Sequence, residues 1–149
     1  MKIGIVGCAG RMGRMVATEI LADDGCTLIG GTEPRGSDFI GMDIGVLAGA
    51  PALGIMVGDN TGAMFAAADA VIDFTVPAAT AAHAVLAADH GTVLVAGTTG
   101  LDAIQQEVVD EAARKIAIVH AANMSVGVNL MLGLTEQVAA ILGDEYDIE

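Results

Sequence analysis

A glycine-rich segment near the start of the chain constrains the fold more than any other feature. Gly7, Gly10 and Gly13 follow an apolar run at 3–6 and precede apolar residues at 12–21 that fit one face of a helix. A strand, a glycine turn and a helix in this order bring free backbone N–H groups and a helix N-terminus to one place. Such a place binds the pyrophosphate of a dinucleotide.

An acidic residue follows at the distance that this type of motif requires. Glu33 comes twenty residues after Gly13, at the end of a second predicted strand over 28–32. A carboxylate there is placed to accept hydrogen bonds from an adenosine ribose. The glycine spacing is GxxGxxG rather than GxGxxG, so a glycine turn that only packs a helix against a sheet stays the alternative.

Composition excludes several classes of function. The chain has 149 residues and a formal net charge of −13, which argues against nucleic acid and anionic membranes as partners. The negative net charge does not exclude an anionic cofactor. The N–H groups of the glycine turn and the side chain of Arg11 or Arg14 would lie close to it and can outweigh the more distant negative charges. Aromatic residues make up 3% of the chain, so stacking on aromatic rings is a poor candidate for binding bases.

The cysteines and the N-terminus predict a cytoplasmic protein. Cys8 and Cys26 are too few for a secreted disulfide framework. The chain begins directly with a predicted strand, so no signal peptide is expected, and no stretch resembles a membrane span. We interpret Cys8, inside the glycine turn, as a small passive residue; a thiol with a lowered pKa at a helix start is the alternative.

Apolar strand-like runs alternate with alanine-rich helical stretches along most of the chain. Further strands are predicted over 54–57, 70–74, 92–96 and 116–120, and helices over 64–68, 77–88 and 102–114. Such alternation is typical of a parallel sheet with helices on both faces. We predict an α/β fold with a doubly wound parallel sheet, a Rossmann-type dinucleotide-binding domain over residues 1–125.

The segment after this domain has a different character. Over 126–142, Leu130, Leu134, Val138 and Ile141 form a stripe that further apolar residues widen to most of the circumference. A helix that is apolar nearly all round is expected to be buried. We therefore predict a trailing apolar helix that folds back onto the sheet or pairs with another chain. Residues 126–149 are interpreted as the first helix and strand start of a truncated substrate or oligomerisation domain.

Three short polar motifs follow predicted strands at their carboxyl ends, where ligands bind in doubly wound sheets. They are Asp73–Thr75, Gly97–Gly100 and Ala121–Ser125. Glycines around two threonines allow the backbone to approach a flat ring, and the Asn123 amide can both donate to and accept from a carboxamide such as that of nicotinamide. Turn and capping roles are the alternative, with Ser125 capping the last helix and Thr75 starting the helix at Pro77.

The histidines carry less weight. His83 and His90 lie on or just after the helix predicted over 77–88, and we predict both to be surface residues. His120 ends a strand and is interpreted as a satisfied core histidine rather than a site residue. No cluster of Cys, His and carboxylates has metal-site spacing, and no nucleophile–base pair is evident. We therefore expect neither a metal nor a catalytic residue in the chain.

At these residues the chain resembles the dihydrodipicolinate reductases of bacterial and plant lysine and diaminopimelate biosynthesis. The resemblance covers essentially all 149 residues and is carried by 7–13, Glu33, 36–37, 41–49, 73–75, 97–100 and 121–129. It implies an oxidoreductase that uses NADH or NADPH. The reaction implied is reduction of the dehydrated form of 4-hydroxy-tetrahydrodipicolinate to tetrahydrodipicolinate.

The resemblance assigns the pyrophosphate to the glycine turn, the adenosine ribose to Glu33, and the nicotinamide side to two later loops. The implied cofactor-binding residues are Gly7, Cys8, Ala9, Gly10, Arg11, Met12, Glu33, Gly97, Thr98, Thr99, Ala121, Ala122, Asn123 and Met124. Thr99 is also implied to approach the substrate. Where the family often has Arg directly after the ribose-binding acid, this chain has Pro34, then Arg35. Neighbouring side chains of an extended segment point in opposite directions, so we expect NADH to be favoured.

The resemblance also implies that a proton-donating His and a substrate-binding Lys would follow residue 149. The chain is therefore expected to be the cofactor-binding half of a reductase, which binds cofactor without turnover, while full-length relatives form homo-oligomers. Self-association through helix 126–142 is a further expectation. Two alternatives stay open. One is the cofactor domain of another two-domain amino-acid or sugar dehydrogenase, and the other is a non-catalytic nucleotide-binding or association module.

Overall fold

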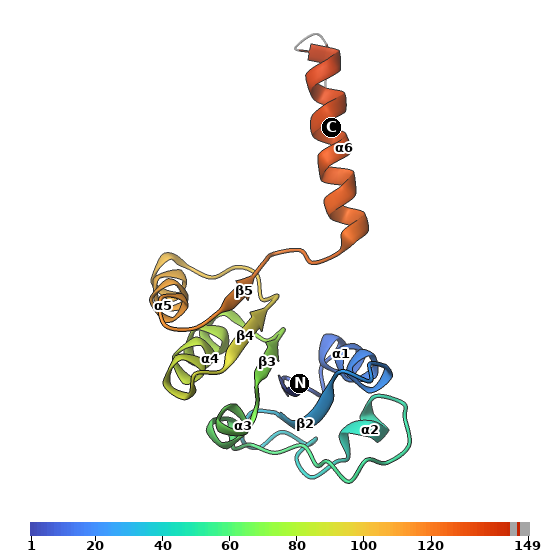
Figure 1. Ribbon diagram of the computed structural model, residues 1–149, viewed down its shortest axis with the longest axis vertical. Coiled ribbons are helices and arrows are strands. Elements are labelled where there is room, and N and C mark those ends of the chain that lie inside the picture. Colours follow the sequence, from blue (N-terminus) through green and yellow to red (C-terminus); the bar gives the residue numbers. More distant parts are fainter. Residues whose placement is uncertain (144–145, 147–149) are drawn as a thin grey trace.

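The computed structural model describes residues 1–143 and 146. Five strands form one parallel sheet in the order β2-β1-β3-β4-β5 (Figure 1). The strands are β1 (Lys2–Val6), β2 (Thr27–Thr32), β3 (Ala70–Asp73), β4 (Val93–Ala96) and β5 (Ile118–His120). The helices are α1 (Arg11–Ala22), α2 (Ile44–Leu47), α3 (Thr61–Ala67), α4 (Pro77–His90), α5 (Ala103–Ala113) and α6 (Val126–Leu142).

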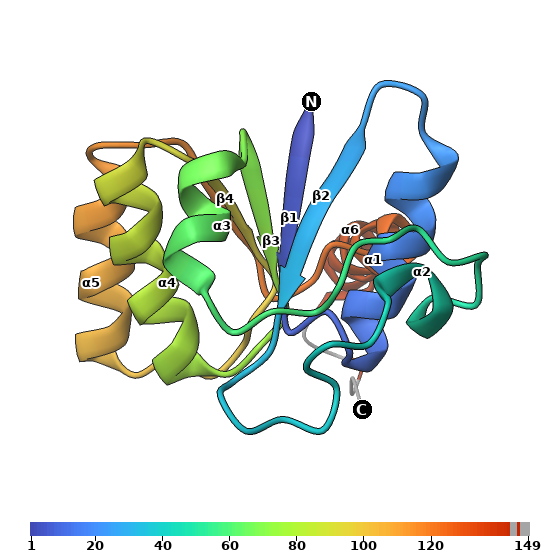
Figure 2. The same ribbon diagram turned by 90° about the horizontal axis from the view of Figure 1, so that it is seen from below.

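Helices cover both faces of the sheet, so the predicted doubly wound α/β fold is confirmed. Figure 2 shows α3, α4 and α5 on one face and α1 and α2 on the other. Helix α5 begins with a capping box, in which Asp102 and Gln105 exchange side-chain to backbone hydrogen bonds of 2.8 and 2.9 Å. None of the described helices is long and apolar enough to cross a membrane.

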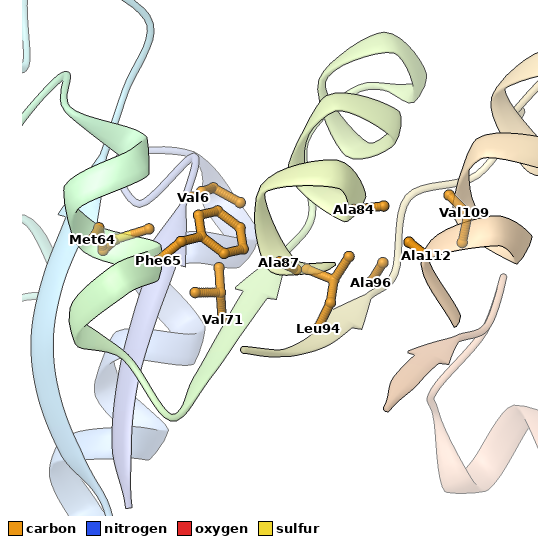
Figure 3. Packing of buried hydrophobic residues seen from close by; sticks show 10 residues of the cluster. All are labelled: Val6, Met64, Phe65, Val71, Ala84, Ala87, Leu94, Ala96, Val109 and Ala112. Carbon is orange, nitrogen blue, oxygen red and sulfur yellow. The ribbon is translucent and has the colours of Figure 1, made fainter. Parts of the chain in front are cut away.

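Alternate side chains of the strands supply two apolar clusters, one on each face. On the side of α3, α4 and α5, Phe65 and Leu94 are fully buried among small residues of these helices (Figure 3). On the side of α1 and α2, Ile5 packs with Ile44. Val6 and Ile5 are neighbours in β1 but belong to different clusters, because successive side chains of a strand point to opposite faces of the sheet. The sheet is thus held from both sides, which fixes where its carboxyl ends lie.

The prediction of a strand over 54–57 is wrong, because within this segment only Met56 makes a bridge, an isolated one to Asp43. The Asp43 carboxylate accepts the N–H groups of Leu53 and Gly54 at 3.1 and 2.7 Å, so the chain turns here instead of entering the sheet. Gly58 nevertheless forms a parallel bridge to the end of β2. That is the place of a further strand in the common dinucleotide-binding sheet, so the segment is a shortened version of it.

Helix α6 extends away from the sheet and has no buried residue (Figure 1). Val126 and Ile141 are more than 80% exposed. The predicted helix is confirmed, and so is its cap, since the Ser125 hydroxyl accepts the Val128 N–H at 3.4 Å. Folding back onto the sheet is contradicted, whereas pairing with another chain stays a prediction. The strand start predicted over 146–149 lies, except for Tyr146, outside the described residues.

Candidate functional site

A cleft of about 620 Å³ lies at the carboxyl edge of the sheet, beside the ends of β1, β2 and β3. The strand order reverses between β1 and β3, so the connections that follow these two strands diverge and leave room for a ligand. The cleft is lined by Val6, Gly7, Gly10, Thr32, Glu33, Pro34, Arg35, Asp59, Thr61, Phe74, Thr75, Val76, Ala79, Ala82 and His83.

The glycine turn forms one wall of this cleft. Gly7 adopts a φ of +69°, a conformation that side chains disfavour, and a Cβ at this position would lie 2.8 Å from the methyl group of Thr75. Gly10 is the N-cap of α1 and provides no capping side chain, so first-turn N–H groups of the helix remain available to a ligand. This arrangement suits an anion, because the helix dipole adds to the free N–H groups.

Arg14 braces the glycine turn from outside the cleft. Its Nε donates to the Ala9 carbonyl at 2.7 Å, and its guanidinium lies 5.4 Å from the centre of the Phe39 ring. A cation over an aromatic face is attracted to it, so the ring holds the side chain in place. The sequence predicted only a general countercharge for Arg14. Its contact with a residue 25 positions away could not be inferred from spacing.

Glu33 reaches the glycine turn directly. Its Oε1 accepts the Ala9 N–H at 2.7 Å, and its own N–H donates to the Gly58 carbonyl at 3.0 Å. The residue is half-buried and lines the cleft. Within the described part of the chain, Oε2 makes no hydrogen bond, so it is the oxygen available to a ligand. The carboxylate therefore both fixes the loop and presents an acceptor beside it.

Cys8 contributes backbone rather than thiol chemistry. Its side chain is fully buried, and a Cβ on Gly31 would lie 2.7 Å from its Sγ. Burial, together with the nearby negative charge of Glu33, raises the pKa of the Cys8 thiol to about 12. A neutral thiol is a poor nucleophile. The interpretation of Cys8 as a passive loop residue is confirmed, and the alternative of a lowered pKa is contradicted.

The end of β3 carries a buried carboxylate. Asp73 is fully buried and accepts hydrogen bonds from the Thr75 N–H at 2.8 Å, the Thr75 hydroxyl at 2.6 Å and Nδ1 of His83 at 2.8 Å. Burial alone would raise the pKa of Asp73, but the hydrogen bonds from His83 and Thr75 hold it below its ordinary value. Thr75 therefore does not cap α4, whose N-cap is Val76.

The surface position predicted for His83 is wrong. Its side chain is only 14% exposed, bonded to Asp73, and its ring centre lies 5.9 Å from that of Phe65. The buried face of α4 includes Thr80, Ala84 and Ala87, and His83 lies next to this face. Because alanines occupy most sides of α4, no stripe of large apolar residues in its sequence indicates which face is buried. His90, at the end of the helix, is exposed as predicted.

Buried hydroxyls link the cleft to the loop after β4. The fully buried Thr80 donates from its hydroxyl to that of Thr98 at 2.8 Å, and Thr80 lies 3.5 Å from the hydroxyl of Thr75. The Phe74 ring, which lines the cleft, lies so close to Gly97 that a Cβ there would overlap it. The side chain of Thr98 thus faces the protein interior. The loop offers a ligand its backbone and the exposed Thr99.

The loop after β5 contains an unsatisfied donor. Asn123 accepts the Ser125 N–H on its Oδ1 at 3.0 Å, while its Nδ2 is buried and has no partner among the described residues. Leaving a buried amide donor unpaired costs about 1–3 kcal/mol, so an acceptor from a ligand would be favourable here. The nearby His120 is satisfied, since its Nε2 donates to the Thr98 carbonyl at 3.0 Å.

The structure brings only part of the predicted site into one cleft. Gly7, Gly10 and Glu33 line it, while Arg11 and Met12 are exposed on the first turn of α1. The loops 97–99 and 121–124 follow β4 and β5 at the same edge of the sheet, outside the residues that line the cleft. Among residues 1–143 and 146, no three His, Cys, Asp or Glu side chains are grouped as metal ligands.

Known proteins share this sequence pattern. Residues 1–124 match the family model of the dihydrodipicolinate reductase N-terminus. The chain is 46% identical over 149 residues to a 4-hydroxy-tetrahydrodipicolinate reductase of Rhizobium meliloti, covering 100% of this chain and 62% of the relative. It is 50% identical over 147 residues to that of Dinoroseobacter shibae, covering 99% and 55%.

A solved structure agrees in fold. The dipicolinate-bound dihydrodipicolinate reductase from Paenisporosarcina sp. TG-14 superimposes with a TM-score of 0.75 over 94% of this chain and 54% of that chain. At 21% identity this likeness shows the fold alone. The chain spans 54–62% of the length of these three relatives. It belongs to the dihydrodipicolinate reductase family, whose N-terminal part it matches.

Proposed function

We propose that this chain is the cofactor-binding half of a dihydrodipicolinate reductase and binds NAD(P)H at the carboxyl edge of its sheet. The observation that carries the proposal is the meeting of the glycine turn, the N-terminus of α1 and Glu33 in one cleft where the strand order reverses. Each part suits one portion of a dinucleotide, and their combination is what dinucleotide-binding sheets share.

The residues present fit such a cofactor. The loop from Gly7 to Met12 would hold the pyrophosphate. The N–H groups of Gly7, Cys8, Ala9 and Gly10 already donate within the protein, so those of Arg11 and Met12 at the start of α1 would be the donors. The free Oε2 of Glu33 would accept from a ribose hydroxyl. The nicotinamide side falls to the loops 97–99 and 121–124, where the unpartnered Nδ2 of Asn123 is a donor for a carboxamide oxygen. The buried thiol of Cys8 is neutral, so it adds no negative charge that would repel the phosphates.

The reaction of the whole reductase is the reduction of the dehydrated form of 4-hydroxy-tetrahydrodipicolinate. The reduced nicotinamide supplies the hydride when bound. The part played by this chain is to orient the cofactor along the sheet edge, because restricting the reactants to one geometry lowers the entropic barrier. Thr99, exposed on the loop after β4, is the residue here that we assign to the substrate side. We expect the 149 residues alone to bind cofactor without turnover.

We further infer a preference for NADH over NADPH. Arg35 lines the same cleft as Glu33, so the expectation that its side chain points away needs correction. However, Nε of Arg35 lies 3.4 Å from an Asp59 carboxylate oxygen, and this exposed ion pair competes with a 2′-phosphate for the guanidinium group. Glu33 adds a second negative charge beside the ribose, which repels the phosphate.

A titration of NADH into the 149-residue chain tests the proposal. Glu33→Ala removes an ionised acceptor and loosens the loop at Ala9, so the expected loss is about 1.5–3 kcal/mol, on the order of tenfold to a hundredfold in Kd. Glu19→Ala removes the same charge from the exposed face of α1 and should bind like wild type. No binding by the folded wild-type chain, or equal binding by both variants, would contradict the proposed site.

A second candidate function, an association module, is favoured by α6. Leu130, Leu134 and Val138 are each at least 50% exposed and follow one another at four-residue spacing. Exposed apolar surfaces of this kind mark interaction sites. We expect the wild-type chain to self-associate and Leu134→Glu to shift it toward monomer in light scattering. A monomeric mass for both proteins would refute pairing through this helix.

A further inference from the structure

The buried carboxylate of Asp73 lies behind the wall of the cleft, where none of the proposed cofactor contacts uses it. Both of its oxygens are engaged: Oδ1 accepts from the N–H and hydroxyl of Thr75, and Oδ2 lies 2.8 Å from Nδ1 of His83. His83 in turn lines the cleft. An acid behind a histidine that faces a ligand space is the arrangement by which proteins orient an imidazole.

The hydrogen bonds define which nitrogen of His83 carries the hydrogen. An ionised carboxylate only accepts, so Nδ1 must donate to Asp73, and in the neutral imidazole Nε2 is then an acceptor. Nε2 makes no hydrogen bond in the described part of the chain. It is also not among the buried unsatisfied atoms there, so it is accessible. The Phe65 ring, at 5.9 Å and tilted by 30°, restricts the imidazole plane.

We propose that Asp73 is a positioning residue that fixes His83 with Nε2 toward the cleft, as an acceptor for an N–H or O–H group of the bound nucleotide. The identity of that ligand rests on the proposed function. The other charged groups of the cleft, Glu33, Arg35 and Asp59, come from the segments after β2 and before α3, and none of them is bonded to His83. His83 is therefore the acceptor on the α4 side.

Asp73→Asn tests the positioning directly. The Asn amide donates to Nδ1 of His83, so the hydrogen moves to Nε2 and the cleft-facing acceptor becomes a donor. We expect ¹⁵N NMR of the unliganded chain to show the Nδ1-protonated form of His83 in wild type and the Nε2-protonated form in the variant. The NADH Kd should rise about tenfold, the effect of losing one hydrogen bond in a closed site.

His83→Asn separates ligand binding from structural support. The Asn amide nitrogen takes the place of Nδ1 and keeps the donor to Asp73, but nothing replaces Nε2. We expect an unfolding midpoint close to that of wild type and an NADH Kd about tenfold higher. His90→Asn, at the exposed end of the same helix, is the matched control and should leave the Kd unchanged.

Two outcomes overturn the proposal. An Nε2-protonated His83 in the wild-type spectrum would refute the positioning by Asp73. Wild-type NADH affinity in a folded His83→Asn variant would refute the role of Nε2. The Asp73–His83 hydrogen bond would then serve only to hold α4 against β3. A wild-type chain that does not bind NADH would instead contradict the proposed function, and the NMR spectrum, recorded without ligand, would still decide the positioning.

Discussion

Replacing Gly13 by alanine tests how closely α1 must approach the glycine turn. Gly13 lies in the first turns of α1, and a Cβ there would overlap the Gly7 carbonyl and lie 2.7 and 2.8 Å from backbone atoms of Cys8. These atoms are backbone and cannot rotate out of the way as a side chain would. The methyl group must therefore push α1 away from the loop that we assign to the pyrophosphate.

Two effects of opposite sign decide the stability of Gly13→Ala. Alanine gains about 1 kcal/mol over glycine inside a helix. Overpacking costs about 1–3 kcal/mol, and the contact with rigid backbone places Gly13 at the upper end. The net expectation is a loss of about 1–2 kcal/mol in the free energy of unfolding. The NADH Kd should rise at least about tenfold, because the N–H groups of the loop lose their alignment.

Urea unfolding and NADH titration measure both effects. Gly62→Ala in α3 is the matched control, because its nearest neighbour beyond the helix lies 4.0 Å from the added Cβ. It should gain up to about 1 kcal/mol and leave binding unchanged. A Gly13→Ala protein that is stabilised like Gly62→Ala and binds NADH like wild type would refute the close-packing argument.

Three further predictions follow from the charges and burial of the site. In the native chain, alkylation at pH 8 should modify Cys26 and spare Cys8, whose buried thiol has a pKa of about 12; equal modification would contradict this. The pKa of Asp73 is lowered, so its stabilisation is complete above its ordinary value of 3.8 and is lost as pH falls through the folded-state value. The difference in free energy of unfolding between wild type and Asp73→Asn, measured in urea, should therefore become smaller below pH 3.8. A difference that does not change with pH would contradict the lowered pKa of Asp73. Asp59→Asn should release Arg35 and lower the NADPH Kd relative to the NADH Kd by up to about fivefold, the range of an exposed ion pair. An unchanged ratio of the two Kd values would show that this ion pair does not affect the choice of cofactor.

Local patterns of the sequence were sufficient for much of the fold. The alternation of strands and helices, the capping box at Asp102 and the cap at Ser125 depend on residues within a few positions of one another. The strand over 54–57 failed because Asp43, more than ten residues earlier, takes two of the N–H groups near its start. Apolar character predicts a strand, but a partner elsewhere in the chain decides whether it joins the sheet.

The sequence by itself determined the glycine turn and the acid that follows it, because both depend on spacing along a strand, a turn and a helix. Only the tertiary structure decided that Glu33 bonds Ala9, that Arg14 lies over Phe39 and that His83 meets Asp73. These contacts join different elements, so they depend on how each helix is rotated against the sheet. In the alanine-rich α4 no stripe of large apolar residues records that rotation, and packing alone selects the face that carries His83.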